Sequence, residues 1–375
     1  MQYAAGERAR ARDLGIVLGR MTPGPWNAIT DVAEVRVGHT TLISGDGPLV
    51  VGQGPVRTGV TVVLPHVGNI GADPVFAAYH VLNGNGEMTG LPWIEESGLL
   101  TTPVAITNTH SVGVVRDAVI QWRVSHAAAD STGYWWSLPV VAETWDGWLN
   151  DINGFHVKPE HVMHALDTAH GGPVEEGSVG GGTGMICNGY KGGIGTASRR
   201  LDAKDGGYTV GVLVQCNYGT RDNLLIAGIP VGREIPAPEP YAFMPSDIAE
   251  RGSIIVVVAT DAPLLAHQLK RVARRVTLGL GRNGSISGNG SGDIFIAFST
   301  ANSGAAAEGT VVNLKMLPND SMDPIFRATV EGTEEAIVNA MVAAHDMTGI
   351  DNHRVIALPH EALRAVLRKY NRLAQ

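Results

Sequence analysis

The chain has 375 residues, of which 44% are hydrophobic and 17% are charged, so it can bury a large core. Its formal net charge is −8 and no block of like charges occurs, whereas a nucleic-acid reader normally carries a basic stripe. The most basic segment, residues 270–275, has Leu269, Val272 and Val276 at helical spacing, which is typical of the solvated face of an amphipathic helix. We therefore expect no nucleic-acid partner.

The sequence also indicates the compartment. Residues 1–12 are mixed in charge and lack the apolar stretch of a secretory signal, and no run of eighteen apolar residues occurs. Cys187 and Cys216 stand in separate apolar or glycine-rich surroundings and form no CxxC motif, so no disulfide is predicted. We expect a cytoplasmic protein without a membrane segment, with a periplasmic location still open.

Strand and helix patterns alternate along the chain, and the 48 glycines, nearly twice the average of roughly 7%, are not periodic. That pattern excludes collagen and indicates many tight turns in a sheet-rich protein. In chain order, strands are predicted at 35–37, 59–64, 104–107, 138–143, 208–216, 253–259 and 294–299. Helices are predicted at 72–82 (capped by Asp73-Pro74), 112–126, 261–280 (with Asp261 as N-cap), 324–330, 333–347 and 359–373.

One proline-rich segment, residues 234–251, ends abruptly at the predicted strand that begins with Ser253. Such a segment is typical of an exposed loop. The hydroxyl of Ser253 can attack the carbonyl of Gly252, which has no Cβ to block the approach. Hydrolysis of the resulting ester would free the α-amine of Ser253, whose ordinary pKa near roughly 7.7–8.0 suits a general base. The alternative is that Gly252-Ser253 is a plain turn.

Four further polar residues stand where predicted strands begin or end. Ser291 and Asp293 are two apart, so both can point to one face of a strand; alternatively they belong to a solvated loop. Asn217 ends a strand, and its amide either donates to an oxyanion or forms a turn. Glu143 emerges from an apolar run and either pairs with a substrate ammonium or is a surface acid.

Taken together, these segments resemble the DmpA-type peptidases, which comprise L-aminopeptidase/D-esterase and β-peptidyl aminopeptidases. The resemblance covers nearly the whole chain, and the order and spacing of its motifs carry it. These motifs are Asn27-Ala-Ile-Thr-Asp-Val, Val37-Gly-His, Asn108-Thr-His-Ser-Val-Gly, Glu143-Thr-Trp-Asp-Gly, Gly180-Gly-Gly-Thr-Gly-Met, Gln215-Cys-Asn-Tyr-Gly, Gly252-Ser253 and Gly290-Ser-Gly-Asp.

The resemblance implies an α/β (α+β) fold, a four-layer αββα sandwich like that of N-terminal-nucleophile hydrolases. It implies a single intertwined domain, 1–375, that cuts itself into an α chain, 1–252, and a β chain, 253–375, and assembles as a homo-oligomer, commonly a tetramer. Ser253 would be the nucleophile and its new amine the base, with Ser291 and Asp293 tuning that amine. Asn217 would supply the oxyanion hole, and Glu143 would hold the free amino group of a short peptide, amide or ester.

Two departures from the family pattern affect the expected substrate. Asp293 stands where some β-peptide-cleaving members carry glutamate, and Trp145, a substrate-binding candidate, stands where some aminopeptidases have tyrosine. We expect no cofactor and no metal, because the dense histidines at 156–170 lack HExxH spacing and the glycine-rich segment 180–195 lacks a nucleotide-binding pattern. An acyltransferase of the ornithine-acetyltransferase type remains as an alternative, although such proteins use threonine as nucleophile, and a non-catalytic glycine-rich binding protein is the third possibility.

Overall fold

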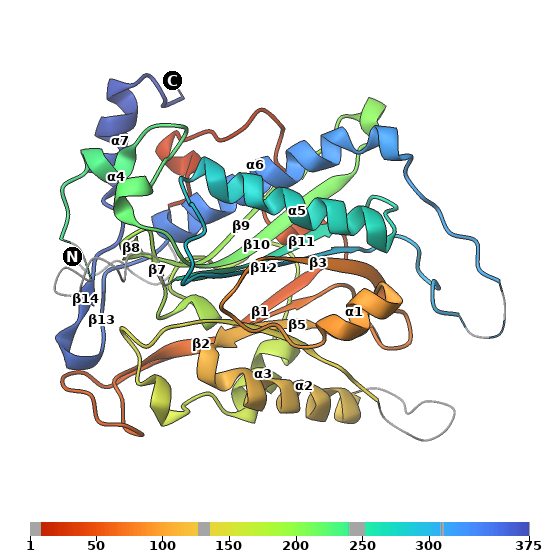
Figure 1. Ribbon diagram of the computed structural model, residues 1–375, viewed down its shortest axis with the longest axis horizontal. Helices are drawn as coiled ribbons and strands as arrows, with labels where there is room; N and C mark the ends of the chain where they lie inside the picture. Colours follow the sequence, from red (N-terminus) through yellow and green to blue (C-terminus); the bar gives the residue numbers. More distant parts are fainter. Residues whose placement is uncertain are drawn as a thin grey trace.

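The computed structural model describes residues 9–126, 136–238, 240, 252–307, 309 and 311–374. It has four layers, in which two β-sheets pack face to face and helices cover both outer faces (Figure 1). Helices α5 (Ala266–Arg282) and α6 (Asp323–Val342) lie on the larger sheet, and α2 (Val112–His126) and α3 (Pro159–Asp167) lie on the smaller one. The predicted αββα sandwich is confirmed.

The larger sheet contains the strand that begins at Ser253. Its order is β4-β3-β12-β11-β10-β9, and its strands are β3 (Val75–Gly84), β4 (Leu99–Leu100), β9 (Gly193–Arg200), β10 (Thr209–Asn217), β11 (Ser253–Thr260) and β12 (Gly292–Ser299). The smaller sheet has the order β1-β2-β5-β6, with β1 (Arg36–Ser44), β2 (Val56–Leu64), β5 (Val104–Asn108) and β6 (Val140–Thr144). Two short ribbons pair β7 (Ile186–Cys187) with β8 (Tyr190–Lys191), and β13 (Met347–Thr348) with β14 (Arg354–Val355).

The helices in the described ranges lie around the two sheets. They are α1 (Leu91–Ser97), α2 (Val112–His126), α3 (Pro159–Asp167), α4 (Val231–Glu234), α5 (Ala266–Arg282), α6 (Asp323–Val342) and α7 (His360–Lys369). In α5 the buried side chains recur at helical spacing, as in Leu269, Val272 and Val276, while the opposite face is solvated. None of the helices in the described ranges combines the length and apolar character needed to cross a membrane.

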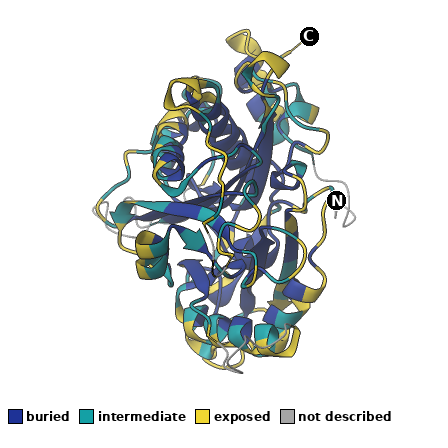
Figure 2. Cartoon of the chain, turned by 90° about the vertical axis from the view of Figure 1, so that its right-hand side faces the viewer, coloured by how far each residue is buried: buried dark blue, intermediate teal, exposed yellow. Residues whose placement is uncertain are grey.

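Apolar side chains alternate along the strands of the larger sheet and so fill two cores. Ile255 and Val257 of β11 point toward the smaller sheet, whereas Ile254 and Val256 point toward α5 and α6. A third core lies between the smaller sheet and α2 and α3. Figure 2 shows the resulting buried centre, with exposed residues on the outer faces of the helices. Because β11 is buried on both faces, its first residue can be polar only if it is bonded.

The structure differs from the predicted helices in three places. The helix expected at 72–82 is wrong, since most of these residues belong to β3 (Val75–Gly84), because pairing with β12 favours the extended chain of Val75, Phe76 and Val81 over local helix signals. Residues 324–330 and 333–347 belong largely to one helix, α6, which continues through Gly332. Asp261 does not cap α5, since Leu265 is the N-cap and Asp261 instead accepts a hydrogen bond from the Thr209 N–H.

Candidate active site

Ser253 is the first residue of β11 and is buried, with 6% of its surface exposed. Its position is set by both neighbouring strands, because it is paired with Asn217 of β10 and with Gly292 of β12. The Gly292 N–H donates to Ser253 Oγ at 3.1 Å and to the Gly252 carbonyl at 3.3 Å. The hydroxyl and the preceding carbonyl are therefore held side by side by one backbone donor.

Gly252 lies too close to the neighbouring strand to carry a side chain. A Cβ at this position would lie 2.1 Å from the Asn217 carbonyl oxygen and 2.5 Å from Tyr218 Cα. Both contacts are with backbone, which cannot move aside as a flexible side chain would. Glycine before Ser253 is thus a packing requirement, and it brings the Gly252-Ser253 peptide against the end of β10.

Asn217 lies directly opposite Ser253 on the face of the sheet that points toward β6. Its Oδ1 accepts a hydrogen bond from the Ile186 N–H at 2.8 Å, and its Nδ2 donates to the Trp145 carbonyl at 3.0 Å. An asparagine amide has two N–H donors, so one donor of Nδ2 is accounted for by Trp145. Directly opposed side chains have Cβ atoms roughly 4.5–5.5 Å apart, which places the Asn217 amide within reach of chemistry at Ser253.

Ser291 and Asp293 are joined by a hydrogen bond from Ser291 Oγ to Asp293 Oδ1 at 2.7 Å. Both are fully buried, and they flank Gly292, the residue that holds Ser253. Alternation along β12 puts Asp293 on the same side as Phe295, which faces the helices, so the pair lies on the opposite face of the sheet from Asn217. Ser291 and Asp293 are therefore in direct contact with each other, and the backbone of Gly292, which lies between them in the chain, is what contacts Ser253.

Glu143 is the next-to-last residue of strand β6 in the smaller sheet and is buried, with 3% of its surface exposed. Its carboxylate accepts hydrogen bonds from the Glu87 N–H at 2.9 Å and from Thr109 Oγ1. Burial raises the pKa of Glu143, while the bonds from Thr109 and Glu87 act in the opposite direction. Gly86 separates Glu143 from Gly292, since a Cβ there would lie 3.3 Å from Glu143 Oε1 and 3.2 Å from Gly292 Cα. The carboxylate therefore faces Gly292, at the end of β12 that pairs with Ser253, across the space between the two sheets.

Trp145 contributes its backbone to the site, while 39% of the residue's surface is exposed. The turn that carries its carbonyl is organised by buried Asp146, whose carbonyl accepts from the N–H groups of Leu149 and Asn150 at 3.1 Å. Burial raises the pKa of Asp146 to about 7, against the effect of hydrogen bonds from Thr58, Asn150 and Asn108. The predicted candidate Trp145 thus lies beside Asn217, on a loop whose shape the sequence did not reveal.

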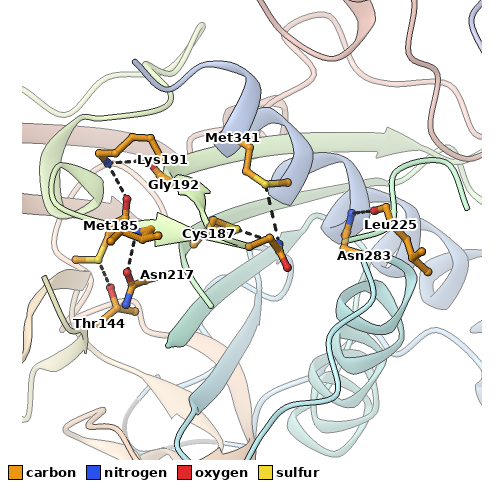
Figure 3. Close-up of a disulfide and its surroundings, with 12 residues drawn as sticks. Thr144, Met185, Cys187, Lys191, Gly192, Asn217, Leu225, Asn283 and Met341 are labelled. Atoms are coloured by element: carbon orange, nitrogen blue, oxygen red, sulfur yellow. Dashed lines mark hydrogen bonds between the residues drawn. A yellow bond between two sulfur atoms is a disulfide. The ribbon is translucent and has the colours of Figure 1, made fainter. Parts of the chain in front are cut away.

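The two cysteines are joined, contrary to the expectation of unpaired thiols. Cys187 and Cys216 form a disulfide, with their Cα atoms 5.7 Å apart. The β7–β8 ribbon folds back onto the end of β10, which brings together residues 29 positions apart in sequence. Each cysteine is the chain neighbour of one partner in the hydrogen bond between Ile186 and Asn217. The disulfide is therefore a second link between the two strands that this hydrogen bond joins (Figure 3).

Several residues of the site carry no signal that the sequence could give. The donors from Ile186 and Gly292 are backbone N–H groups, and Thr109 is one hydroxyl in the Asn108-Thr-His-Ser motif, where the Asn108 side chain caps a short 3₁₀ helix by accepting from the His110 N–H. The proline-rich segment 234–251 falls largely outside the described residues, at 239 and 241–251. Among the described residues, no group of His, Cys, Asp and Glu side chains is arranged to hold a metal.

Comparison with known proteins matches this geometry to a family. The model of peptidase family S58 matches residues 27–355. The chain is 54% identical to the beta-peptidyl aminopeptidase BapA of Sphingosinicella microcystinivorans, over 99% of this chain and 95% of that protein.

Two solved structures are similar throughout. A beta-aminopeptidase from Burkholderia sp. matches with a TM-score of 0.88 and 50% identity, over 96% of this chain and 99% of that one. The L-aminopeptidase D-Ala-esterase/amidase of Ochrobactrum anthropi, a prototype for the serine aminopeptidases and a variant of the Ntn hydrolase fold, matches with a TM-score of 0.90 and 50% identity, over 97% and 99%. The chain therefore belongs to peptidase family S58, and it is a serine aminopeptidase with the fold of N-terminal-nucleophile hydrolases.

Proposed function

We propose that the chain cuts itself between Gly252 and Ser253 and then uses Ser253 to remove N-terminal residues from short peptides, amides and esters. One observation carries the proposal: Ser253 Oγ and the Gly252 carbonyl share the Gly292 N–H, with Asn217 on the adjacent strand. Attack of the hydroxyl on the carbonyl breaks the peptide bond and forms an ester at Ser253. Water then hydrolyses this ester, releasing the Gly252 carboxylate and restoring the hydroxyl.

The cleaved form supplies its own base. The α-amine of Ser253, with an ordinary pKa near roughly 7.7–8.0, takes the proton of its own hydroxyl as that hydroxyl attacks a substrate carbonyl. The buried pair Ser291–Asp293, next to the strand partner of Ser253, would orient and tune the amine. The second N–H of Asn217 Nδ2 would donate to the oxyanion that develops on the substrate. This chemistry needs no cofactor.

Glu143 would select substrates with a free amino terminus. A buried carboxylate that faces the Ser253 end of β12 is suited to bind an ammonium group, and Trp145 would line the same side. Similarity to a beta-peptidyl aminopeptidase over nearly the full chain leads us to include N-terminal β-amino acids among the substrates. The acyltransferase alternative is less well supported, because Ser253 replaces the threonine that such proteins use.

A panel of aminoacyl p-nitroanilides tests the function. We expect release of nitroaniline from compounds with a free L-α- or β-amino group, and at least about 100-fold slower release from their N-acetylated counterparts, since these cannot pair with Glu143. The rates with the D-α compounds show whether the enzyme also accepts D-amino acids at the N-terminal position. Equal hydrolysis of free and acetylated compounds would contradict the proposal, and so would transfer of the acyl group to an added amine in preference to water.

The organisation of the whole protein is also proposed. We propose one intertwined domain, since β10 from the 1–252 part and β12 from the 253–375 part both pair with β11. A homotetramer of cleaved units in the cytoplasm remains the proposed assembly and location.

A further inference from the structure

Lys191 is a fully buried residue that the proposed reaction does not use directly. It ends β8, and its Nζ donates to the carbonyls of Met185 at 2.8 Å, Gly192 at 3.0 Å and Gly182 at 3.4 Å. Three acceptors match the three N–H donors of an ammonium group. Because burying a charge is costly unless it is well bonded, a lysine at this depth calls for an explanation.

The hydrogen bond between Lys191 and the Met185 carbonyl connects Lys191 to Asn217, the proposed oxyanion donor, through one peptide group. The Met185 carbonyl and the Ile186 N–H belong to one peptide group, and this N–H donates to Asn217 Oδ1 at 2.8 Å. Figure 3 shows Lys191, Met185 and Asn217 next to one another, with the hydrogen bond from Lys191 to the Met185 carbonyl and the bond from the Ile186 N–H to Asn217. A cation at the carbonyl end of an amide makes its N–H a stronger donor, and hydrogen bonds in a chain polarise one another in the same sense. In the Asn217 side-chain amide, the hydrogen bond that Oδ1 accepts polarises the group in the same way and makes the N–H groups of Nδ2 stronger donors.

The surroundings keep this chain of groups in place. The Met185 carbonyl accepts a second hydrogen bond from the Gly192 N–H at 2.9 Å, and Met185 Sδ accepts from Thr144 Oγ1 at 2.8 Å. The disulfide between Cys187 and Cys216 holds the two strands that carry Ile186 and Asn217. Rigid, buried donors are worth more to an oxyanion than mobile ones, because they need no rearrangement during the reaction.

We propose that Lys191 is a positioning residue that acts through the Met185–Ile186 peptide to orient Asn217 and to strengthen its N–H donor toward the reaction's oxyanion. The proposal rests on the proposed function, since it requires Asn217 to bind the oxyanion. Lys191 itself does not touch the substrate. Its effect belongs in kcat, because the charge that it stabilises develops only in the transition state.

A double-mutant cycle tests the inference. Lys191→Met should lower kcat by about 10- to 100-fold with KM changed less than about threefold, a smaller loss than the roughly 10²–10³-fold typical of removing an oxyanion donor. In an Asn217→Ala background, Lys191→Met should lower kcat no further, because its path of action is already broken. Rates are normalised to the amount of cleaved chain that begins at Ser253. Lys191→Arg, which keeps the charge, should recover part of the loss, and Lys191→Gln, which is neutral, should not.

Arg57→Met is the matched control. Arg57 is also buried, and it donates to the carbonyls of Ser44, Gly45, Val56 and Thr348, none of which belongs to the Met185–Ile186 peptide. Its replacement should lower the thermal unfolding temperature and leave kcat within about threefold of wild type.

The outcomes separate the two proposals. If Asn217→Ala leaves kcat unchanged, the oxyanion role in the proposed function is wrong. If Asn217→Ala is impaired and Lys191→Met lowers kcat by the same factor in both backgrounds, Lys191 acts independently of Asn217 and the inference is overturned. A Lys191→Gln enzyme with wild-type kcat would overturn it as well. Loss of cooperative unfolding in all three Lys191 variants would assign the residue to the fold alone and would likewise contradict the proposal.

Discussion

Ser253→Ala should remain a single 375-residue chain and should lose at least roughly 10⁴-fold in kcat/KM toward aminoacyl p-nitroanilides. The change removes the atom that attacks Gly252, so no cut forms and no α-amine is released at residue 253. It also removes the nucleophile for every substrate. Both losses have one cause, and a denaturing gel together with a steady-state assay measures them.

The fold of this variant should be intact, because alanine is smaller than serine and the hydroxyl bonds only to the Gly292 N–H among the interactions described for it. Ser125→Ala, which removes an exposed hydroxyl bonded to its own helix at the Trp122 carbonyl, is the matched control and should cleave and hydrolyse normally. Ser253→Cys keeps a nucleophile and should still cleave. Cleavage or wild-type hydrolysis by Ser253→Ala would exclude Ser253 as the nucleophile.

Glu143→Gln should lower kcat/KM by roughly 100-fold for substrates with a free amino terminus, corresponding to about 3 kcal/mol for removing one partner of a buried, hydrogen-bonded charge pair. The amide fits the same space but carries no charge to hold an ammonium group. Substrates without an amino group should be affected less than about threefold. Rate measurements on matched aminoacyl and desamino p-nitroanilides separate these two effects.

The same residue should produce an acidic limb in the pH profile. Because burial raises the pKa of Glu143, the carboxylate that binds the substrate is lost at a higher pH than for an ordinary glutamate as the pH falls. The limb should appear in kcat/KM, which reports the free enzyme, as a second fall below the one caused by protonation of the Ser253 α-amine, and only this second fall should be absent from Glu143→Gln. Glu87→Gln, which removes a neighbouring exposed charge, is the control and should keep the limb. An unchanged kcat/KM in Glu143→Gln would remove Glu143 from substrate binding.

Most of the main strands could be predicted because they are short apolar runs bounded by glycine or proline, whereas the four-layer arrangement was implied by the family resemblance. The predicted strands at 104–107, 208–216, 253–259 and 294–299 correspond to β5, β10, β11 and β12. β9 was not predicted, because glycine and arginine interrupt it, and its buried Arg199 is stabilised by ion pairs with Glu335 at 2.6 Å and Glu331 at 3.6 Å, both of α6. β3 was wrongly predicted as a helix, since only its pairing with β12 decides its conformation.

The candidate site residues could be selected from motifs, but their contacts could not. Pairing register places Asn217 opposite Ser253, and this register is a property of the folded sheet. Lys191 stands in a glycine-rich segment with nothing in the sequence to indicate that it is fully buried. The disulfide was missed for a similar reason, because the separation of 29 residues says nothing about the ribbon that brings Cys187 to Cys216.

The intact masses and N-terminal sequences of freshly purified, denatured wild-type protein test the central claim most directly. Self-cleavage at Gly252-Ser253 predicts two polypeptides of 252 and 123 residues, the smaller beginning at Ser253. A preparation that remains one 375-residue chain, yet hydrolyses aminoacyl amides, would contradict the claim that an N-terminal Ser253 performs the reaction.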